Sequence, residues 1–394
     1  MAPARLHPLP LSSYPSLQEN QVDCPEVGLS FHIIETGYAA DKSRPLLLLL
    51  HGFPEIAYSW RKVMPALAEA GYYVVAPDQR GYGRTGDLDD AGHEKDDLDS
   101  FGMLRLVTDM IVLVHALGYH SVKCVVGHDF GAVVASLCAL SRPDFFRSVM
   151  MMSHPFKGSP AVPFDTAHQE RRSDALSPDH SPDIHEELAH LPEPRKHYKW
   201  YYSTPSANRD LLEPVEGLGR FLRAYFHTKS ADWPQNDPHA LRAWSAAELA
   251  QMPFYYIMPL QETMREAVAR DMPSEEVIAG EGSRWLADPE LDVYVHEWRR
   301  TGFQGGLNWY RSATAPSNAR DLMILAGKKI EVPAMYVAGA KDWGTYQDPG
   351  AIEHCADSCS DFRGVKLIQD AGHWVQQEQP ERLKDEMMQF LAHA

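Results

Sequence analysis

Residues 125–132 read Val-Val-Gly-His-Asp-Phe-Gly-Ala, an apolar run that leads into a tight turn with Gly127 and Gly131 on either side of Asp129. In a Gly-x-nucleophile-x-Gly turn the central residue has a strained backbone at the top of a sheet, and its small neighbours let strand and helix pack closely. Aspartate, with an ordinary pKa of about 3.9, is already an anion at neutral pH and can attack an sp³ carbon directly. The turn therefore predicts a nucleophilic Asp129. The plain alternative is an aspartate that caps the helix expected over 130–140.

Several other short apolar runs are bounded by turn residues and separated by helical patterns. They lie at 46–50, 72–76, 122–126, 148–152, 332–338 and 365–368. This alternation indicates an α/β fold, with a mostly parallel central sheet and helices on both of its faces. Polar loops follow the first two runs, with the sequences His-Gly-Phe-Pro-Glu at 51–55 and Asp-Gln-Arg-Gly-Tyr-Gly at 78–83. Open α/β sheets place their sites at such carboxyl ends of strands.

The regular alternation breaks after the run at 148–152. Residues from 155 to about 195 are rich in Pro, Ser, Asp and His and indicate a linker or surface excursion. Residues from about 196 to 317 look helical and aromatic-rich, with helices expected over 244–250 and 261–270. We therefore expect an N-terminal extension at 1–26, a core formed by 27–154 and 320–394, and a linker and helical cap at 155–319.

The composition excludes several classes of partner. Lys and Arg number 37 against 54 Asp and Glu, a net charge of −17 without a basic stripe, so nucleic acid and anionic membranes are poor candidates. Five cysteines, an odd number, argue against a disulfide framework, and the pair Cys355 and Cys359 has no second pair at zinc spacing. Residues 1–20 lack an apolar stretch of signal-peptide length, and the run at 46–50 is too short to span a bilayer. We expect a cytoplasmic protein that needs no metal or other cofactor.

An ester formed on an aspartate must be hydrolysed, which requires a base and a group that orients it. Asp342 follows the apolar run 335–338, and His373 follows the last run in Asp-Ala-Gly-His-Trp. Nucleophile, acid and then histidine is the chain order of the α/β-hydrolase fold, which we therefore predict with an inserted helical cap. Asp348 is a competing acid, although its Asp-Pro-Gly setting is more typical of a turn.

Hydrolysis of that ester also needs donors for the oxyanion that forms when water attacks. The backbone N–H of Phe130, directly after the nucleophile, is one expected donor, and that of Phe53 in the 51–55 loop is the other. Pro54 has no N–H and is a candidate for a cis peptide bond. A plain turn after a strand is the alternative interpretation of this loop.

The chain resembles the soluble epoxide hydrolases of the α/β-hydrolase fold, particularly fungal members, from about residue 28 onward. The resemblance rests on five motifs: the loops 51–55 and 78–83, Gly-His-Asp-Phe-Gly at 127–131, Asn-Trp-Tyr-Arg at 308–311 and Gly-His-Trp at 372–374. Members often have Trp where this chain has Phe130, a difference that should alter the pocket more than the mechanism.

The resemblance implies two tyrosines whose hydroxyls bind the epoxide oxygen, because an alkoxide is a poor leaving group unless its charge is stabilised or protonated. Tyr310 matches one of them, and the other is assigned to Tyr198, with Tyr201 or Tyr202 as alternatives if the register shifts. Packing is the more frequent role of a tyrosine. Glu55 resembles a residue that positions the hydrolytic water, and loop packing is its alternative.

These residues together predict an epoxide hydrolase. Asp129 would form an ester, water activated by His373 would cleave it, and a vicinal diol would leave. A dehalogenase and a ligand-binding protein without turnover are the alternatives. Apolar and aromatic residues in the expected cap suggest an apolar aryl or alkyl epoxide; these are Trp244, Phe254, Tyr255, Tyr256 and Trp309. The expected partners are that small molecule and water, and the oligomeric state is open, with a homodimer as one alternative.

Overall fold

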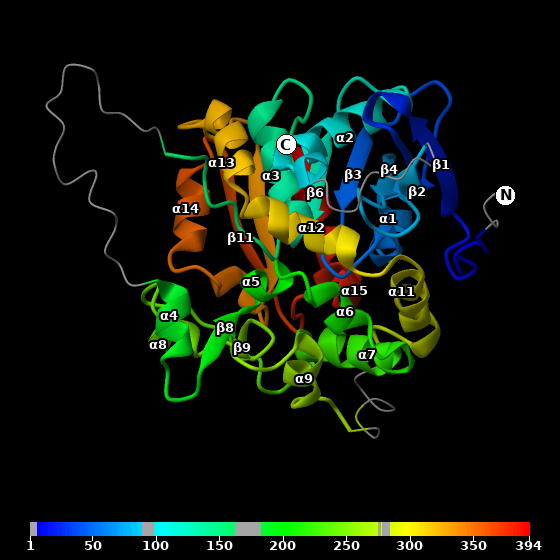
Figure 1. Cartoon of the computed structure of the whole chain (residues 1–394). Coiled ribbons are helices and arrows are strands. Elements are labelled where there is room, and N and C mark those ends of the chain that lie inside the picture. Colours follow the sequence, from blue (N-terminus) through cyan, green and yellow to red (C-terminus); the bar gives the residue numbers. More distant parts are fainter. Residues whose placement is uncertain (1–5, 89–97, 162–182, 275–276, 278–283) are drawn as a thin grey trace, which may run out of the picture.

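The computed structural model describes residues 6–88, 98–161, 183–274, 277 and 284–394. Its central sheet has nine strands, in the order β1-β2-β4-β3-β6-β7-β10-β11, with β5 paired to β2 (Figure 1). The strands are β1 (Gln18–Cys24), β2 (Leu29–Thr36), β3 (Leu46–Leu50), β4 (Tyr73–Pro77), β5 (Gly86–Asp87), β6 (Cys124–His128), β7 (Val149–Met152), β10 (Ala334–Gly339) and β11 (Phe362–Ile368). From β4 to β11 neighbouring strands are parallel, as the sequence predicts.

The central strands are apolar because they are buried on both faces. All five leucines of β3 are at most 1% exposed. Helices flank the sheet: α1 (Met64–Glu69), α2 (Met103–Ala116), α3 (Phe130–Ser141), α14 (Ala351–Asp357), α15 (Val375–Glu378) and α16 (Pro380–His393). Among them, α3 packs against β6 and β7, and α16 packs against β11 and α1. These elements confirm the predicted α/β-hydrolase fold class.

The N-terminal part of the chain differs from the expected extension. Residues 18–24 form β1, which pairs with β2 in antiparallel register from Gln18 opposite Glu35 to Cys24 opposite Leu29. The strand is polar and mostly exposed, because it lies at the edge of the sheet and only its last residue is buried. An edge strand of this kind carries no continuous apolar run, so hydrophobic periodicity does not predict it.

The described residues between β7 and β10 form mainly helices (Figure 1, green and yellow). Their elements are α4 (Ile184–Ala189), β8 (Arg195–His197), α5 (Tyr198–Tyr202), α6 (Ala207–Leu212), α7 (Leu218–Thr228), α8 (Ala246–Leu249), β9 (Ile257–Pro259), α9 (Met264–Ala269), α11 (Asp288–Thr301), α12 (Gln304–Ala313) and α13 (Pro316–Leu322). The linker or surface excursion expected at 155–195 lies partly outside the described residues, and α4 forms within its last part. The expected boundary at 319–320 falls within α13.

The inserted helices cover the loops at the carboxyl ends of the strands. The indole Nε1 of Trp298 on α11 donates to the carbonyl of Pro54 at 2.8 Å, and that of Trp309 on α12 donates to the carbonyl of Arg80 at 2.9 Å. The loops that follow β3 and β4 are therefore held between the sheet and the insertion.

Two further findings concern the described residues. None of their helices is long and apolar enough to cross a membrane. All five cysteines are free and buried, including Cys355 and Cys359.

Candidate active site

Asp129 occupies a strained turn between β6 and α3. Its φ and ψ angles are 52° and −118°, and its side chain makes no capping hydrogen bond to α3. A Cβ added to Gly127 would lie 2.1 Å from the carbonyl oxygen of Gly131, and one added to Gly131 would lie 2.3 Å from that of Leu50. The turn therefore closes only with glycine on both sides. This geometry is that of a nucleophile turn, and it disfavours the helix-cap interpretation of Asp129.

The two oxygens of the Asp129 carboxylate have different surroundings. Oδ1 accepts a hydrogen bond from the backbone N–H of Phe53 at 3.2 Å. Oδ2 lies 3.6 Å from Nε2 of His373. A Cβ on Gly52 would lie 2.4 Å from the Asp129 Cβ, so glycine is what lets the 51–55 loop approach this closely. One oxygen is thus held by a backbone donor while the other faces the histidine.

His373 is brought together with Asp342, the first of the two predicted acids. Its Nδ1 lies 3.0 Å from Asp342 Oδ1, which also accepts the N–H of Gly344 at 2.7 Å. Its Nε2 is buried and lies 3.6 Å from Asp129 Oδ2, with no nearer partner among the described residues. The competing Asp348 instead forms an ion pair with Lys157 at 2.5 Å. Asp342 thus orients the ring so that Nε2 points toward Asp129.

The charges of this cluster stabilise one another. Burial alone would raise the pKa of Asp129, but the hydrogen bond and charge of His373 hold it well below its usual range. Burial alone would lower the pKa of His373, yet the charge of Asp342 and the hydrogen bonds to Asp129 and Asp342 raise it to about 9. Before substrate reacts, the pair is therefore an Asp129 carboxylate beside a protonated His373.

Tyr198, at the start of α5, and Tyr310, on α12, lie close together above this pair. Their ring centroids are 6.1 Å apart, and the Tyr198 hydroxyl donates to Oε1 of Gln347 at 3.1 Å. Burial and then the negative charge of Asp129 raise the pKa of both tyrosines. Both phenols are therefore neutral donors within the field of the nucleophile.

The two alternative tyrosines are engaged elsewhere. The hydroxyl of Tyr201 faces Asp210 Oδ2 at 3.5 Å, and that of Tyr202 donates to the hydroxyl of Tyr225 at 3.3 Å. The ring of Tyr202 does reach the site, since its centroid is 5.0 Å from that of Tyr310. This arrangement favours the register in which Tyr198 is the first tyrosine.

Aromatic rings form the wall around the carboxylate. Phe130 meets Tyr310 edge to face at a centroid distance of 4.8 Å, and Phe53 meets it at 5.6 Å. The Phe53–Pro54 peptide bond is cis, as considered from the sequence. The N–H of Phe53 donates the hydrogen bond to Oδ1 of Asp129. Among the described residues, the N–H of Phe130 makes no hydrogen bond to this oxygen. Of the aromatic residues expected to line the cap, Trp244 does not fit, because it is 46% exposed.

Glu55 is fully buried and contacts the site through its neighbours. Its Oε2 lies 2.6 Å from Nδ1 of His128 and accepts a hydrogen bond from Gln376, and its Oε1 accepts hydrogen bonds from Gln376 and Gln377. Nε2 of His128 lies 2.7 Å from the backbone carbonyl of His373. Sequence reasoning missed this link, although His128 directly precedes the nucleophile. Glu55 thus supports the backbone of the histidine through the ring of His128.

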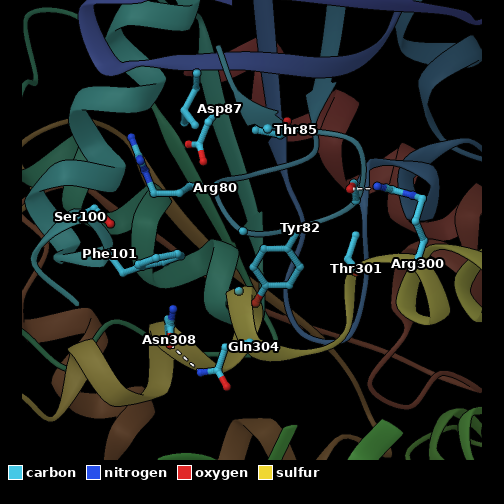
Figure 2. Close-up of a pocket in the computed structure, with 15 residues that line it drawn as sticks. Arg80, Tyr82, Thr85, Asp87, Ser100, Phe101, Arg300, Thr301, Gln304 and Asn308 are labelled. Atoms are coloured by element: carbon cyan, nitrogen blue, oxygen red, sulfur yellow. Dashed lines mark hydrogen bonds between the residues drawn. The ribbon is translucent and has the colours of Figure 1, made fainter. Parts of the chain in front are cut away.

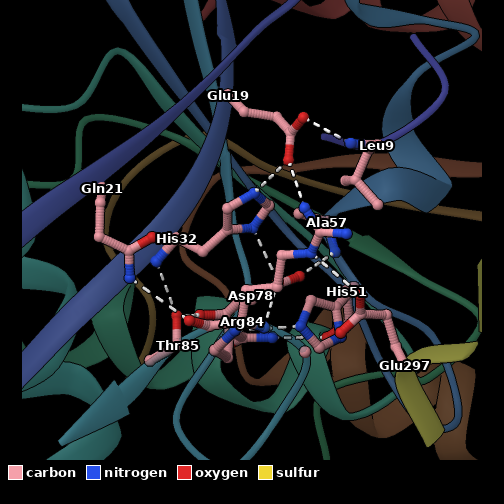
Figure 3. Close-up of polar contacts among 12 residues, drawn as sticks. Leu9, Glu19, Gln21, His32, His51, Ala57, Asp78, Arg84, Thr85 and Glu297 are labelled. Atoms are coloured by element: carbon pink, nitrogen blue, oxygen red, sulfur yellow. Dashed lines mark hydrogen bonds and ion pairs between the residues drawn. The ribbon is translucent and has the colours of Figure 1, made fainter. Parts of the chain in front are cut away.

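A second buried network holds the loops around the site (Figure 3). Asp78, which follows β4, accepts the backbone N–H groups of Ala57 at 2.8 Å and Arg84 at 2.9 Å, and lies 2.8 Å from Nδ1 of His32. His32 Nε2 in turn lies 3.1 Å from Glu19 on β1. The carboxylate of Asp78 therefore holds two loops in place. One carries Phe53 and ends near Ala57, and the other runs from Asp78 to Arg84.

This network predicts a pH dependence of stability. Burial alone would lower the pKa of His32, but the charge and hydrogen bond of Asp78 raise it to about 9 in the folded protein, against 6.5 ordinarily. The stabilisation is complete below pH 6.5 and is lost as the pH rises through 9. We expect the wild-type free energy of unfolding to fall across this window by about 2–3 kcal/mol more than that of His32→Gln. Denaturant titrations from pH 6 to 9.5 measure this.

The exposed His7 supplies a matched control for that experiment. His7→Gln should retain the wild-type dependence. Parallel stability curves for the wild type and His32→Gln would contradict the assignment.

A pocket of about 320 Å³ is lined by Gln304 and Asn308 of α12 but not by Tyr310 of the same helix (Figure 2). Arg300 donates to the carbonyl of Gly83 at 2.6 Å and Gln304 donates to Asn308 at 2.8 Å along its rim. Neither Asp129 nor His373 lines this pocket. It is therefore separate from the cluster around the nucleophile.

Comparison with known proteins gives consistent matches. A family profile of the alpha/beta hydrolase fold matches residues 45–195. Epoxide hydrolase B of Mycobacterium tuberculosis is 33% identical over 369 residues, which cover 89% of this chain and 92% of that protein. Epoxide hydrolase A of the same organism is 31% identical over 366 residues, which cover 92% and 94%.

Solved structures give the same picture. Potato (Solanum tuberosum) epoxide hydrolase I has a TM-score of 0.70 and 27% identity, covering 96% of this chain and 100% of that one. An epoxide hydrolase from an endophytic Streptomyces has a TM-score of 0.69 and 28% identity, covering 96% of both chains. These relatives are bacterial and plant proteins.

Proposed function

The chain belongs to the epoxide hydrolases of the α/β-hydrolase fold, and from this premise we propose that it converts apolar aryl or alkyl epoxides to vicinal diols through an ester on Asp129. The observation that carries the covalent route is the unequal environment of the two Asp129 oxygens. The N–H of Phe53 holds Oδ1, while Oδ2 has no backbone donor among the described residues and faces His373 at 3.6 Å. A carboxylate held at one oxygen is oriented to attack with the other.

In the first step Oδ2 of Asp129 bonds to an epoxide carbon and the carbon–oxygen bond of the ring breaks. The developing alkoxide is held by the hydroxyls of Tyr198 and Tyr310 and takes a proton from one of them. The imidazolium of His373 returns a proton to the tyrosine. The products are a hydroxyalkyl ester and a neutral histidine.

In the second step His373, oriented by Asp342, removes a proton from water. The resulting hydroxide attacks the carbonyl carbon of the Asp129 ester. The oxyanion forms on Oδ1, where the N–H of Phe53 already donates, and the N–H of Phe130 is the proposed second donor. Collapse of this intermediate breaks the bond from the carbonyl carbon to Oδ2, and the leaving diol oxygen takes the proton from His373. Asp129 is left as a carboxylic acid that keeps the second proton of the water, and it passes this proton to His373, which restores the carboxylate and the imidazolium. In this scheme Glu55 positions the water indirectly, because its contacts run through His128.

The wider setting is part of the same proposal. Phe53 and Phe130 pack edge to face against Tyr310, and Trp309 packs against Phe130, so the proposed site has aromatic walls that favour an apolar substituent on the epoxide. We also propose a cytoplasmic protein of fungal type, on the motifs of the sequence, in which residues 155–319 act as linker and cap. The homodimer stays a proposal that sedimentation analysis of the purified protein would test.

Hydrolysis of racemic styrene oxide to its diol tests this function, and halide release from a haloalkane is measured beside it. We expect diol formation and no halide, because the residues at positions 53 and 130 present phenyl rings and not the polar donors that a departing halide needs. Halide release without diol would indicate a dehalogenase. Binding of the epoxide without either product would indicate a protein that only binds the ligand.

The roles of the two tyrosines predict a specific loss of activity. We expect Tyr198→Phe and Tyr310→Phe each to lower kcat/KM for epoxide opening by about 10- to 100-fold, because each variant removes one donor to the developing alkoxide. Stopped-flow measurement of ester formation isolates this step. Tyr201→Phe is the matched control, since its hydroxyl faces Asp210, and its rate should stay near that of the wild type. A larger loss in Tyr201→Phe than in Tyr198→Phe would shift the register of the assignment.

A further inference from the structure

Lys229 follows the end of α7 and is buried, with 3% of its surface exposed. Its ammonium lies over the rings of four tyrosines, at centroid distances of 4.6 Å from Tyr256, 5.0 Å from Tyr225, 5.3 Å from Tyr255 and 5.9 Å from Tyr198. No ion pair to a carboxylate is found for it in the described part of the chain. The faces of aromatic rings attract a cation without neutralising it. The ammonium of Lys229 is therefore surrounded by aromatic rings, with no carboxylate paired to it among the described residues.

The backbone of the same residue contacts the proposed base. The carbonyl oxygen of Lys229 accepts the N–H of His373 at 2.8 Å. A Cβ added to Gly372 would lie 2.4 Å from this oxygen, so the two segments are in close contact. Lys229 is thus joined to the histidine through its main chain and to Tyr198 through its side chain.

The charge of Lys229 opposes that of the carboxylates around His373. Burial lowers the pKa of His373 and the charge of Asp342 raises it, and these are the two largest effects. The charge of Lys229 has the next largest effect and lowers this pKa. The charge of Lys229 also lowers the pKa of Asp129, although the effects of burial and of His373 on this pKa are larger. The ring of His128 lies beside His373 at 4.8 Å, and its partner Glu55 lies behind it. The other lysine near this group, Lys199, has its ammonium 5.8 Å from the ring of Tyr198.

Resting on the covalent route proposed above, we propose that Lys229 is a positioning residue that drives His373 from its protonated form to its base form once Asp129 is esterified. Esterification removes the negative charge of Asp129 and the hydrogen bond that it offered to the imidazolium. Asp342 alone then stabilises that cation, while Lys229 continues to repel it. The imidazolium gives its proton to the tyrosine that protonated the alkoxide, and the neutral ring is ready to take a proton from water.

Lys229→Met tests this, because it retains length and removes the charge. We expect the hydrolysis rate of the ester at pH 7 to fall by about tenfold and its acid limb to move up by about one pH unit, since a like charge near a group shifts its pKa by about this amount. Rapid quenching and peptide mass measurement should then find accumulated Asp129 ester that disappears as the pH rises. Lys229→Arg retains the charge and should keep the wild-type limb.

Tyr256→Phe is the matched control, because it keeps the ring beside the ammonium and removes a buried hydroxyl that has no hydrogen-bond partner in the described part of the chain. Its acid limb should stay at the wild-type pH. If Lys229→Met lowers the rate equally at every pH, the charge has no part in the reaction and the proposal is overturned. Lys229→Gln gives a second neutral variant if the methionine variant does not fold.

A readout without substrate separates this inference from the proposed function. NMR titration of the His373 ring in the free protein, assigned by its absence in His373→Gln, should give a higher pKa in Lys229→Met than in the wild type. An unchanged value overturns the role of Lys229, even where the wild type hydrolyses epoxides. A raised value in a protein that forms neither ester nor diol leaves the charge effect standing and overturns the proposed function.

Discussion

Asp129→Asn is expected to lower kcat/KM for epoxide hydrolysis by about 10⁴-fold or more, because the amide replaces the anion that attacks the ring. The neighbouring contacts should survive, since asparagine keeps an oxygen that can accept the N–H of Phe53. Loss of activity would then reflect lost nucleophilicity and not a disturbed loop. Steady-state hydrolysis of styrene oxide measures the loss, and a circular dichroism spectrum like that of the wild type serves as its control.

A single turnover in oxygen-18 water identifies the atom that the water attacks in the wild-type enzyme. In a single turnover the label should enter the carboxylate of Asp129 and be missing from the diol, because water attacks the ester carbonyl and the diol receives its new oxygen from Oδ2. Peptide mass measurement locates the label. A labelled diol in the first turnover, or an Asp129→Asn variant with wild-type rates, would rule out the ester.

His373→Gln is expected to stop the reaction at the ester on Asp129. Ring opening should continue, with solvent supplying the proton through the tyrosines, while ester hydrolysis slows by about 10³-fold because no base remains to activate water. The protein should then carry a stable adduct on Asp129 whose mass equals that of the epoxide. Intact-protein mass spectrometry after incubation with substrate measures it.

Asp342→Asn provides the companion variant for this experiment. It leaves the imidazole in place but removes the carboxylate that orients Nδ1 and stabilises the positive charge of the ring. We expect a slower release of the ester than in the wild type, faster than in His373→Gln. Rapid diol formation by His373→Gln without any adduct would contradict the two-step route.

The residues around the nucleophile could be predicted from the sequence because each lies in a short motif directly after a strand. Asp129, Asp342 and His373 follow β6, β10 and β11, and parallel strands bring such loops to one edge of the sheet. The structure brings these three side chains together with the N–H of Phe53. Their chemistry could be anticipated because sequence order and residue type were sufficient.

Contacts between distant segments could not be predicted in the same way. The hydroxyl partners that separate Tyr198 from Tyr201 lie at Gln347 and Asp210, and no local pattern specifies them. The ammonium of Lys229 meets rings from two other parts of the insertion, and its carbonyl meets the last loop of the core. Such contacts depend on how the insertion folds back on the sheet. The strand β1 was missed for a related reason, since its partner and not its composition makes it a strand.

The glycines at the nucleophile turn also bear on how such an enzyme can change over evolutionary time. At Gly52, Gly127 and Gly131 the backbone has no room for even a methyl group. The turn that carries Asp129 therefore depends on positions that can hold only glycine. In the proposed function, the tyrosines that contact a substrate come from α5 and α12, which are separate segments of the insertion. New substrate preferences can therefore accumulate in the helices while the reaction itself is left unaltered.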